Sequence, residues 1–278
     1  MKKRFLVAAV AATLVSPIAA FADATVYGNV HVSINDFDSA NNLDMSSNTS
    51  SIGVKGKEDL GGGMTVLFKV EFQVDPTERN GTASDIGATK DSTAALTDRD
   101  QWVGLKGGMG TVKFGTMTNN YKQTGSKVDP MYRTVLEGRG FMKTQSNLHS
   151  GAGESRGRMT NTIQYSSPKM GGMQMVINTT FNARVDTTGP SDENIDETIG
   201  VGFRYEAKAF SVYVDYLDFS YDATESESAT KIGGTFKTGP VKLGVQLEQT
   251  EDLMGSDYMM VSANYSLDKN NGIYFAYG

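Results

Sequence analysis

The stretch from Thr65 to Val74 reads TVLFKVEFQV and alternates between apolar and polar side chains. One face of an extended chain receives Val66, Phe68, Val70, Phe72 and Val74, and the other receives Thr65, Lys69, Glu71 and Gln73. Successive side chains of a β-strand point to opposite faces of its sheet. The stretch therefore predicts a strand with one apolar face and one charged face.

An apolar sheet face needs a partner. In a water-soluble domain, that partner is a second sheet or a layer of helices with an apolar stripe. We find no helical period after the N-terminal segment, so no such layer is predicted. Lipid is the remaining partner, and the pattern favours a sheet that lies in a membrane.

The same alternation recurs along the chain and predicts thirteen strands. They are 24–34, 50–58, 64–74, 99–106, 110–116, 157–166, 173–182, 197–206, 209–218, 229–237, 241–249, 258–267 and 272–278. The connections alternate between tight turns, such as Asp59–Gly63, and long polar loops, such as 75–98 and 117–156. Membrane barrels sort their loops in this way, with short periplasmic turns and long external loops. The predicted fold class is therefore all-β, a transmembrane antiparallel β-barrel.

The N-terminus predicts export. Lys2, Lys3 and Arg4 precede an apolar run from Phe5 to Ala20, and Ala20-Phe21-Ala22 supplies small residues in an A-x-A pattern. These features predict a secretory signal peptide over residues 1–22 and a barrel domain over 23–278. The apolar run is shorter than the ~20 residues that a spanning helix needs, which disfavours the alternative of a membrane anchor.

Charge and composition narrow the function. Without the three basic residues of the leader, 23 basic residues face 32 acidic ones, a net charge of −9, which argues against a nucleic-acid partner. The chain has no cysteine, so neither disulfides nor thiolate chemistry are available. We predict no cofactor and no metal site.

Several motifs in order resemble the general porins of Gram-negative outer membranes. They are Val26-Tyr27-Gly28, Ile52-Gly53-Val54-Lys55-Gly56, Glu58–Gly63, Arg99–Lys106, Gly110–Gly115 and Arg158–Tyr165. The resemblance covers the whole chain after the leader. It implies a water-filled barrel of sixteen strands whose third external loop folds into the lumen, and a homotrimer. It further implies contacts with outer-membrane lipid and lipopolysaccharide, assembly by the barrel assembly machinery, and small hydrophilic solutes and ions as the cargo.

The chain departs from that family in its strand number. Thirteen strands are predicted, whereas bacterial single-chain barrels use even numbers, and the last residues, Tyr277 and Gly278, replace the family's terminal aromatic. We expect the sequence to be a fragment that lacks about three strands. The alternative is a smaller barrel of twelve or fourteen strands.

Facing the apolar side of each strand to lipid assigns the charged side to the lumen. The predicted lumen residues are Asn29, His31, Lys55, Lys57, Lys69, Glu71, Arg99, Lys113, Arg158, Arg204, Asp215, Lys231, Lys237, Lys242 and Glu248. Cations outnumber anions on this wall, while Asp and Glu gather in the predicted external loops. Because a narrow channel focuses the field of its wall, we expect a weak preference for anions.

The resemblance gives Arg99 and Arg158 a specific role. They match two arginines of the family's basic ladder opposite the inward loop, whereas Ser51 and Asn29 replace a third arginine and a lysine. The inward loop, 117–156, carries Asp129, Arg133 and Glu137, which are the mixed charges that a constriction needs. We therefore predict a pore constriction and lumen lined by Arg99, Arg158, Lys55, Lys57, Lys69, Lys113, Asp129, Arg133 and Glu137.

Aromatic residues near the strand ends fall on the lipid-facing side of this scheme. They are Trp102, Tyr165, Tyr205, Tyr216, Tyr265 and Tyr277, and they predict a girdle at the membrane interfaces.

Two other functions stay open at this point. The first is a structural or adhesive barrel with a plugged lumen. The second is an outer-membrane hydrolase, but His31 and Ser33 lie about 6.6 Å apart along a strand, beyond hydrogen-bond reach. His149 in the long loop has no adjacent carboxylate, and none of the familiar hydrolase motifs appears.

Overall fold

A computed structural model describes the fold of this chain for residues 23–37, 42–77, 96–134, 136–137, 158–181, 183–184, 195–220, 226–250 and 257–278. The predicted leader, residues 1–22, lies outside the described residues. Among the described residues, no helix has both the length and the apolar character needed to cross a membrane.

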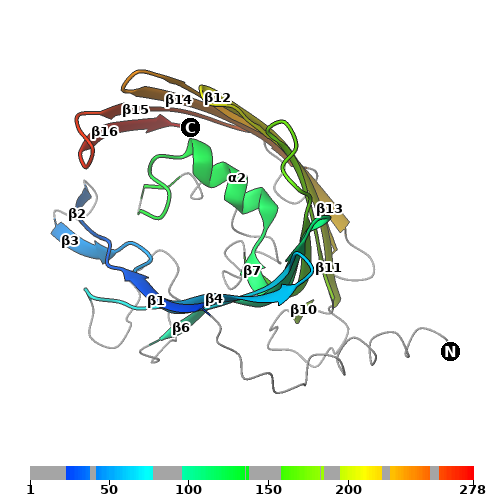
Figure 1. The fold of residues 1–278 in the computed structure, drawn as a ribbon. Helices are drawn as coiled ribbons and strands as arrows, with labels where there is room; N and C mark the ends of the chain where they lie inside the picture. Colours follow the sequence, from blue (N-terminus) through cyan, green and yellow to red (C-terminus); the bar gives the residue numbers. More distant parts are fainter. Residues whose placement is uncertain are drawn as a thin grey trace.

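The described chain is built almost entirely from β-strands around one helix (Figure 1). The strands are β1 (Asp23–Asn29), β2 (Val32–Phe37), β3 (Asn42–Ser47), β4 (Ser51–Gly61), β5 (Met64–Gln73), β6 (Thr97–Gly107), β7 (Gly110–Thr118), β8 (Arg158–Ser166), β9 (Met173–Thr180), β10 (Ala183–Arg184), β11 (Ile195–Glu206), β12 (Phe210–Ser220), β13 (Ser226–Thr238), β14 (Val241–Thr250), β15 (Tyr258–Ser266) and β16 (Gly272–Tyr277). The helix is α2 (Asn120–Val128).

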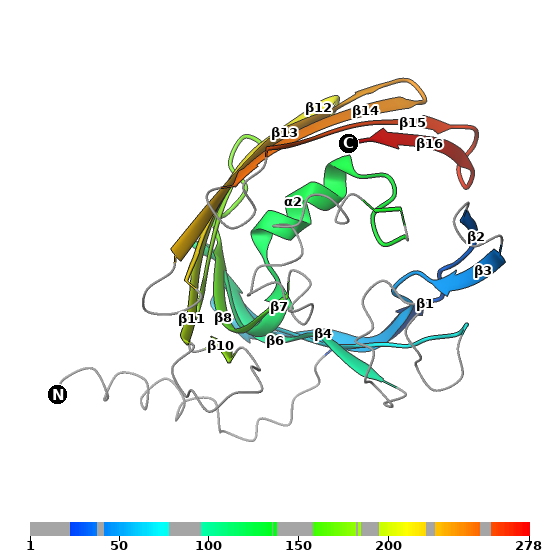
Figure 2. The same ribbon diagram turned by 180° about the vertical axis from the view of Figure 1, so that it is seen from behind.

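One antiparallel sheet forms the wall. Its strands follow one another in the order β1-β4-β5-β6-β7-β8-β9-β11-β12-β13-β14-β15-β16, and β10 pairs with β11 outside this path. The path contains thirteen strands, one for each strand predicted from the alternation. The wall curves around α2, with β1 and β16 as its edges (Figures 1 and 2). The prediction of an antiparallel barrel-type sheet is confirmed.

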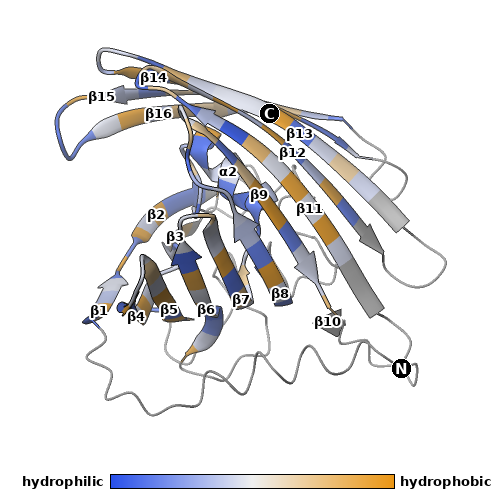
Figure 3. Cartoon of the chain, turned by 45° about the vertical axis from the view of Figure 1, so that its right-hand side comes forward, coloured by the Kyte–Doolittle hydropathy of each residue, from blue (hydrophilic) through white to orange (hydrophobic). Residues whose placement is uncertain are grey.

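Burial in this sheet is inverted relative to a soluble domain. The fully buried side chains are mostly polar, for example Lys231, Gln246 and Glu248, whereas the sheet exposes large apolar residues on its other face, for example Phe203, Phe236 and Leu247. The only cluster of buried hydrophobic residues among those described has four members. Figure 3 shows apolar and polar bands alternating along the strands. A polar inside and an apolar outside are what a membrane barrel requires.

The first predicted strand is wrong in its second half. The structure ends β1 at Asn29, and the next residues turn away to form a separate hairpin of β2 and β3. This hairpin lies within the predicted strand 24–34 and the predicted loop 35–49. The turn is fixed at His31, whose backbone carbonyl accepts from Asn48 N at 2.7 Å and whose backbone N donates to Ser50 Oγ at 3.0 Å.

The structure also contains a helix that the search for an apolar helical period did not detect. Helix α2 lies inside the curve of the sheet (Figure 2). Asn119 caps its first turn, because Oδ1 accepts a hydrogen bond from Lys122 N at 2.8 Å. The buried residues of α2 include Tyr121 and Val128, but Asn120, Lys122 and Thr124 are buried with them, so the buried face is mixed and gives no continuous apolar stripe.

Candidate functional site

The inner face of the sheet can be traced from strand to strand, because residues that pair across neighbouring strands point to the same side. Lys55 of β4 pairs with Lys69 of β5, and Lys69 pairs with Trp102 of β6. Val103, the next residue of β6 after Trp102, points to the opposite face of the sheet. Its side chain is exposed, as expected for an outward-facing residue of a membrane sheet.

A β-bulge changes the pattern on β6. Val70 pairs with Gln101, but Phe72 pairs with Asp98, so two residues of β6, Arg99 and Asp100, stand opposite the single residue Glu71. Bulges of this kind leave one extra residue in a strand and re-aim side chains. As a result, Arg99 and Asp100 both reach the inner face, although they are neighbours in sequence.

Five charged residues form a connected network on this part of the inner face, which we call the open-wall network: Lys69, Glu71, Arg99, Asp100 and Arg158. Arg99 Nε lies 2.6 Å from Glu71 Oε1, and Lys69 Nζ bridges Glu71 Oε2 at 3.0 Å and Asp100 Oδ2 at 2.9 Å. Arg158 Nε lies 3.1 Å from Asp100 Oδ1.

Neutral side chains complete this network. Arg99 Nη1 donates to Gln73 Oε1 at 3.0 Å, and the Tyr27 hydroxyl donates to Glu71 Oε2 at 2.8 Å. Thr118 Oγ1 donates to Asp100 Oδ1 at 3.1 Å. Three cations and two anions thus hold one another in place, which leaves a local charge of one positive unit. Asp100 and Glu71 thus neutralise most of the positive charge of Lys69, Arg99 and Arg158.

Trp102 corrects the predicted aromatic girdle. The bulge shifts the alternation by one residue, so Trp102 lies on the inner face with Lys69, and Lys113 Nζ stands 4.4 Å from the centre of its ring. An ammonium over an indole ring is a favourable cation–π arrangement. The tyrosines behave differently, since Tyr205 and Tyr216 share the outer face with Val212 and Val214.

The remaining predicted lysines of this wall are more accessible. Lys55 and Lys57 are exposed on β4, and Lys55 Nζ lies 5.0 Å from the centre of the Tyr27 ring. Within the described ranges, neither these two lysines nor Lys113 has a carboxylate within ion-pair distance.

A second group of charged residues lies on the far side of the sheet, where β11–β15 carry α2. We call this region the helix-bearing wall. Lys231 of β13 pairs in register with Asp215 of β12 on one side and with Glu248 of β14 on the other, and all three side chains are almost fully buried. Asn120 and Thr124 of α2 both donate hydrogen bonds to the Asp215 carboxylate.

The helix-bearing wall also binds the backbone of α2. Lys231 Nζ donates to the backbone carbonyl of Tyr121, and the Tyr121 hydroxyl donates to Glu248 Oε2 at 2.9 Å. Burial, and after it the negative charge of Glu248, raises the pKa of the Tyr121 phenol well above its ordinary value. Tyr121 therefore remains a hydrogen-bond donor at every physiological pH.

The two ends of α2 are anchored as well. Near its N-terminus, Arg204 donates to Asn120 Oδ1, and at its C-terminus Lys242 Nζ donates to Lys127 O at 2.6 Å and Ser262 Oγ to Val128 O at 2.6 Å. Gly202 permits this close approach, because a Cβ at that position would collide with the side chains of Asn120 and Asp215.

The predicted loop charges lie in the turn that follows α2. Asp129 Oδ1 accepts from Met131 N at 2.8 Å, and Glu137 Oε2 accepts from Arg133 N at 2.7 Å. Arg133 adopts a left-handed backbone with φ of 69°. Asp129 and Glu137 are both buried, and at least one oxygen of each carboxylate stabilises the turn by accepting a hydrogen bond from a backbone N–H. The part of the loop from 138 to 156 lies outside the described residues.

Sequence reasoning missed Asp100, the inward position of Trp102 and the docking role of Asp215, Lys231 and Glu248. A bulge has no reliable signature in a single sequence, and alternation alone cannot tell a lumen residue from one that is covered by a helix. The predicted acidic loops lie largely outside the described residues, as does His149. His31 is exposed, and within the described ranges no group of three or more His, Asp and Glu side chains could hold a metal ion.

The comparison with known families identifies this architecture. A sequence family described as Gram-negative porin matches residues 7–278. The chain belongs to the Gram-negative porin family. It is accordingly a protein of the outer membrane, and the family's members are channels rather than enzymes.

Curated relatives agree with the family. Major outer membrane protein P.IB of Neisseria gonorrhoeae is 26% identical over 224 residues, which are 75% of this porin and 55% of that protein. An outer membrane porin protein of Bordetella pertussis is 27% identical over 309 aligned positions, which cover 98% of this porin and 76% of that protein. The chain thus spans about half the length of the neisserial relatives that it matches.

Solved structures support the fold. An anion-selective porin from Comamonas acidovorans superposes with a TM-score of 0.71 at 21% identity, over 92% of this chain and 78% of that one. Salmonella typhi OmpF in complex with daunomycin gives a TM-score of 0.67 at 14% identity, over 91% and 77% of the two chains. At these identities the likeness concerns the fold alone.

Proposed function

We propose that this porin forms the wall of a water-filled channel for the passive diffusion of small hydrophilic solutes and ions. The observation that carries the proposal is the division of the inner face into two walls. Helix α2 is held against β11–β15 by Asp215, Lys231 and Lys242, while the open-wall network lies on β5, β6 and β8. A loop folded against one side of a barrel narrows the lumen, whereas a plug has to fill it.

The charge balance of the open wall supports a weak anion preference. The open-wall network carries one net positive charge, and Lys55, Lys57 and Lys113 add cations without a carboxylate partner among the described residues. Charge confined in a low-dielectric channel acts on every ion that passes. One structural relative is named an anion-selective porin, but the charges of this chain are what support the proposal.

The constriction is proposed to lie between Arg99 and Arg158 on the open wall and the turn after α2, which contributes Asp129, Arg133 and Glu137. We also propose a homotrimer surrounded by outer-membrane lipid and lipopolysaccharide and inserted by the barrel assembly machinery, as the family resemblance implies. The short turns are proposed to face the periplasm.

A planar-bilayer recording under a salt gradient tests the function. We expect stepwise conductance and a reversal potential that shows a modest anion preference at about 0.1 M salt. The preference should shrink at about 1 M salt, because the screening length falls from about 10 Å to about 3 Å. Cation preference in the unmodified protein contradicts the charge argument. Absence of conductance, together with absence of liposome swelling in small sugars, favours the plugged structural barrel instead.

A further inference from the structure

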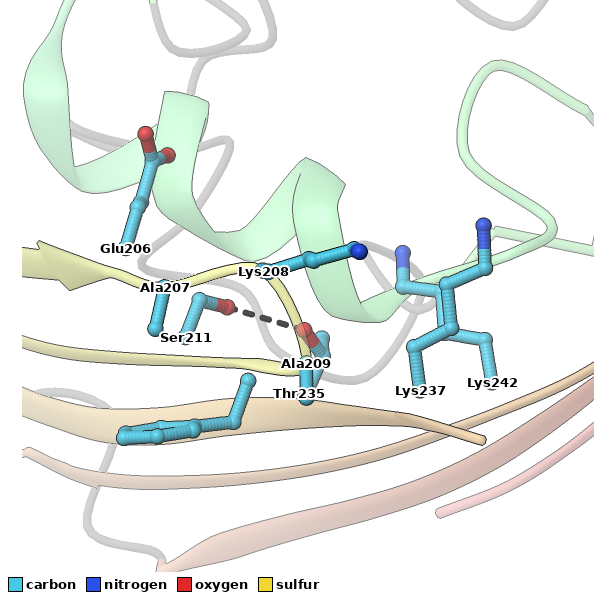
Figure 4. A pocket seen from close by; sticks show the side chains of 9 residues that line it. Glu206, Ala207, Lys208, Ala209, Ser211, Thr235, Lys237 and Lys242 are labelled. Carbon is cyan, nitrogen blue, oxygen red and sulfur yellow. Dashed lines mark hydrogen bonds between the residues drawn. The ribbon is translucent and has the colours of Figure 1, made fainter. Parts of the chain in front are cut away.

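A cavity of about 290 Å³ lies at the short-turn end of the helix-bearing wall. It is bounded by the turn between β11 and β12 and by the facing ends of β13 and β14 (Figure 4). Its lining includes Lys208, Lys237 and Lys242, and Figure 4 shows their three amino groups pointing into the same space. The volume is close to the lower limit of small-molecule sites, about 300 Å³.

The three lysines are brought together by the sheet. Lys237 and Lys242 are direct partners across the β13–β14 pair, and the backbone N of Lys237 donates to Ala209 O at 2.6 Å, which holds the turn that carries Lys208 against them. Like charges directly opposite each other on neighbouring strands destabilise a sheet. The cluster is therefore unfavourable when empty, and a bound anion would relieve it.

The acids nearby do not neutralise the cluster. Glu206 is the acidic residue in the lining, and its two carboxylate oxygens are engaged by Lys127 of α2 and Lys169. Among the described residues, Lys208 and Lys237 have neither a hydrogen bond nor an ion pair through their side chains. Lys242 uses Nζ for one hydrogen bond, to Lys127 O, and an ammonium group has three donors.

Lys237 and Lys242 lie on the lumen side of the wall, although the cavity lining also includes Phe210, which pairs with Phe236 on the outer face. On the same two strands, Phe236 and Leu243 alternate with Lys237 and Lys242, and these apolar neighbours are 51% and 47% exposed on the outer face. A phosphate group of a lipid headgroup would have to approach from that outer face. A soluble anion can reach the lysines from the lumen.

We propose that this cavity is a binding site for small anions that carry two or more negative charges, such as pyrophosphate, phosphate esters or dicarboxylates. Ser211 and Thr235 line the same cavity and hydrogen-bond each other at 2.8 Å, so the hydroxyl that accepts in this pair still has its own hydrogen to donate to a bound oxyanion. The site does not depend on the channel function, because it needs only the folded wall.

The test is a titration with inorganic pyrophosphate in phosphate-free detergent micelles. The lysines of the full-length protein are ¹³C-dimethylated, which keeps their charge, and their signals are assigned with Lys→Gln variants. We expect the methyl signals of Lys208, Lys237 and Lys242 to shift saturably at low salt. The signal of Lys269, an exposed lysine in the β15–β16 turn at the same end of the barrel, should not follow them.

The double variant Lys208→Gln/Lys237→Gln removes two charges but keeps the bond from Lys242 to the helix. It should weaken pyrophosphate binding at least tenfold with an unchanged circular dichroism spectrum, whereas Lys269→Gln should bind as the unmodified protein does. Equal affinity in the double variant, or no saturable shift at the three lysines, overturns the proposal. Because no conduction is measured, a protein that conducts but does not bind pyrophosphate refutes this site and leaves the channel proposal intact.

Discussion

The two charged walls of the lumen use the same residue types for different purposes. On the helix-bearing wall, Lys231 is 0% exposed and Asp215 and Glu248 are 1% exposed, because α2 covers them. On the open wall, Lys55 and Lys57 are exposed and the Lys69 side chain is 20% exposed. The first set binds a helix, and the second set can meet ions and solutes.

This difference shows what a polar inner face can do in a barrel. Buried polar groups cost free energy unless they are hydrogen-bonded, so α2 has to offer polar partners rather than an apolar stripe. Asn120, Thr124 and the Tyr121 carbonyl supply them. Charged residues under α2 are therefore structural anchors, whereas Lys55 and Lys57, which lie exposed on the open wall, can meet ions and solutes.

The largest expected contrast concerns Trp102, the chain's single tryptophan. Because the bulge on β6 places it on the inner face, its fluorescence should be quenched by acrylamide from the aqueous side and not by brominated lipid. The matched control is Val103→Trp in a Trp102→Phe background, which moves the indole to the outer face and should reverse the two responses. Quenching of Trp102 by brominated lipid shows that the bulge assignment is wrong.

The next largest effect is expected at the centre of the helix-bearing wall. Lys231→Met removes the cation between Asp215 and Glu248 and the donor to Tyr121 O. Removing one partner of a buried charge pair costs about 3–5 kcal/mol. The urea concentration at the midpoint of unfolding in micelles should therefore be clearly lower for Lys231→Met than for the unmodified protein.

The control for this substitution is Lys55→Met on the open wall, which removes an exposed lysine. Exposed substitutions usually change stability by less than about 0.5 kcal/mol. If Lys231→Met and Lys55→Met lower the free energy of unfolding by the same amount, the two walls do not differ in stability as the burial of their lysines indicates.

The strands could be predicted from sequence because lipid demands an apolar side chain at every second position. That demand recurs in β1 and in the twelve wall strands from β4 to β16, so all thirteen wall strands could be found in one pass. It is absent in β2 and β3, which leave the wall, and the first predicted strand is accordingly too long. The inner face obeys no such uniform rule.

The candidate site could be predicted only in part for the same reason. The lysines of β4 and β5 follow from alternation and lie on the inner face, whereas Arg99 reaches that face together with Asp100 only because of the bulge. Asp100 could not be found, because the bulge opposite Glu71 breaks the alternation without a turn residue to mark it. Helix α2 could not be found because its partner is a polar wall.

A smaller effect is expected at the start of α2. Asn119→Ala removes the side chain that caps Lys122 N, which costs about 1 kcal/mol of helix stability. Amide hydrogen exchange within α2 should speed up roughly fivefold, since about 1.4 kcal/mol corresponds to a factor of ten. Asn119→Ser keeps a capping oxygen and should restore most of the protection. Unchanged exchange in the alanine variant means that the wall alone holds the helix.

The smallest effect is expected on the ion preference, which we ascribe to the open wall. It is best tested with two substitutions that remove charges of opposite sign. Arg99 is a poor choice, because it is 1% exposed and its loss would remove its bonds to both Glu71 and Gln73. Arg158 and Asp100 are a better pair, with side chains 17% and 16% exposed and 3.1 Å between Nε and Oδ1.

Arg158→Gln removes one positive charge, and Asp100→Asn removes the negative charge that compensates Arg158 and Lys69. Reversal potentials at about 0.1 M salt should therefore move in opposite directions, toward cations for Arg158→Gln and toward anions for Asp100→Asn. We expect permeability ratios to change roughly two- to threefold, or about 0.4–0.7 kcal/mol per ion. Both shifts should shrink at about 1 M salt, where the screening length is about 3 Å. Two shifts of the same sign would show that the substitutions act by moving the inward loop, and the open wall would then not be the element that selects ions.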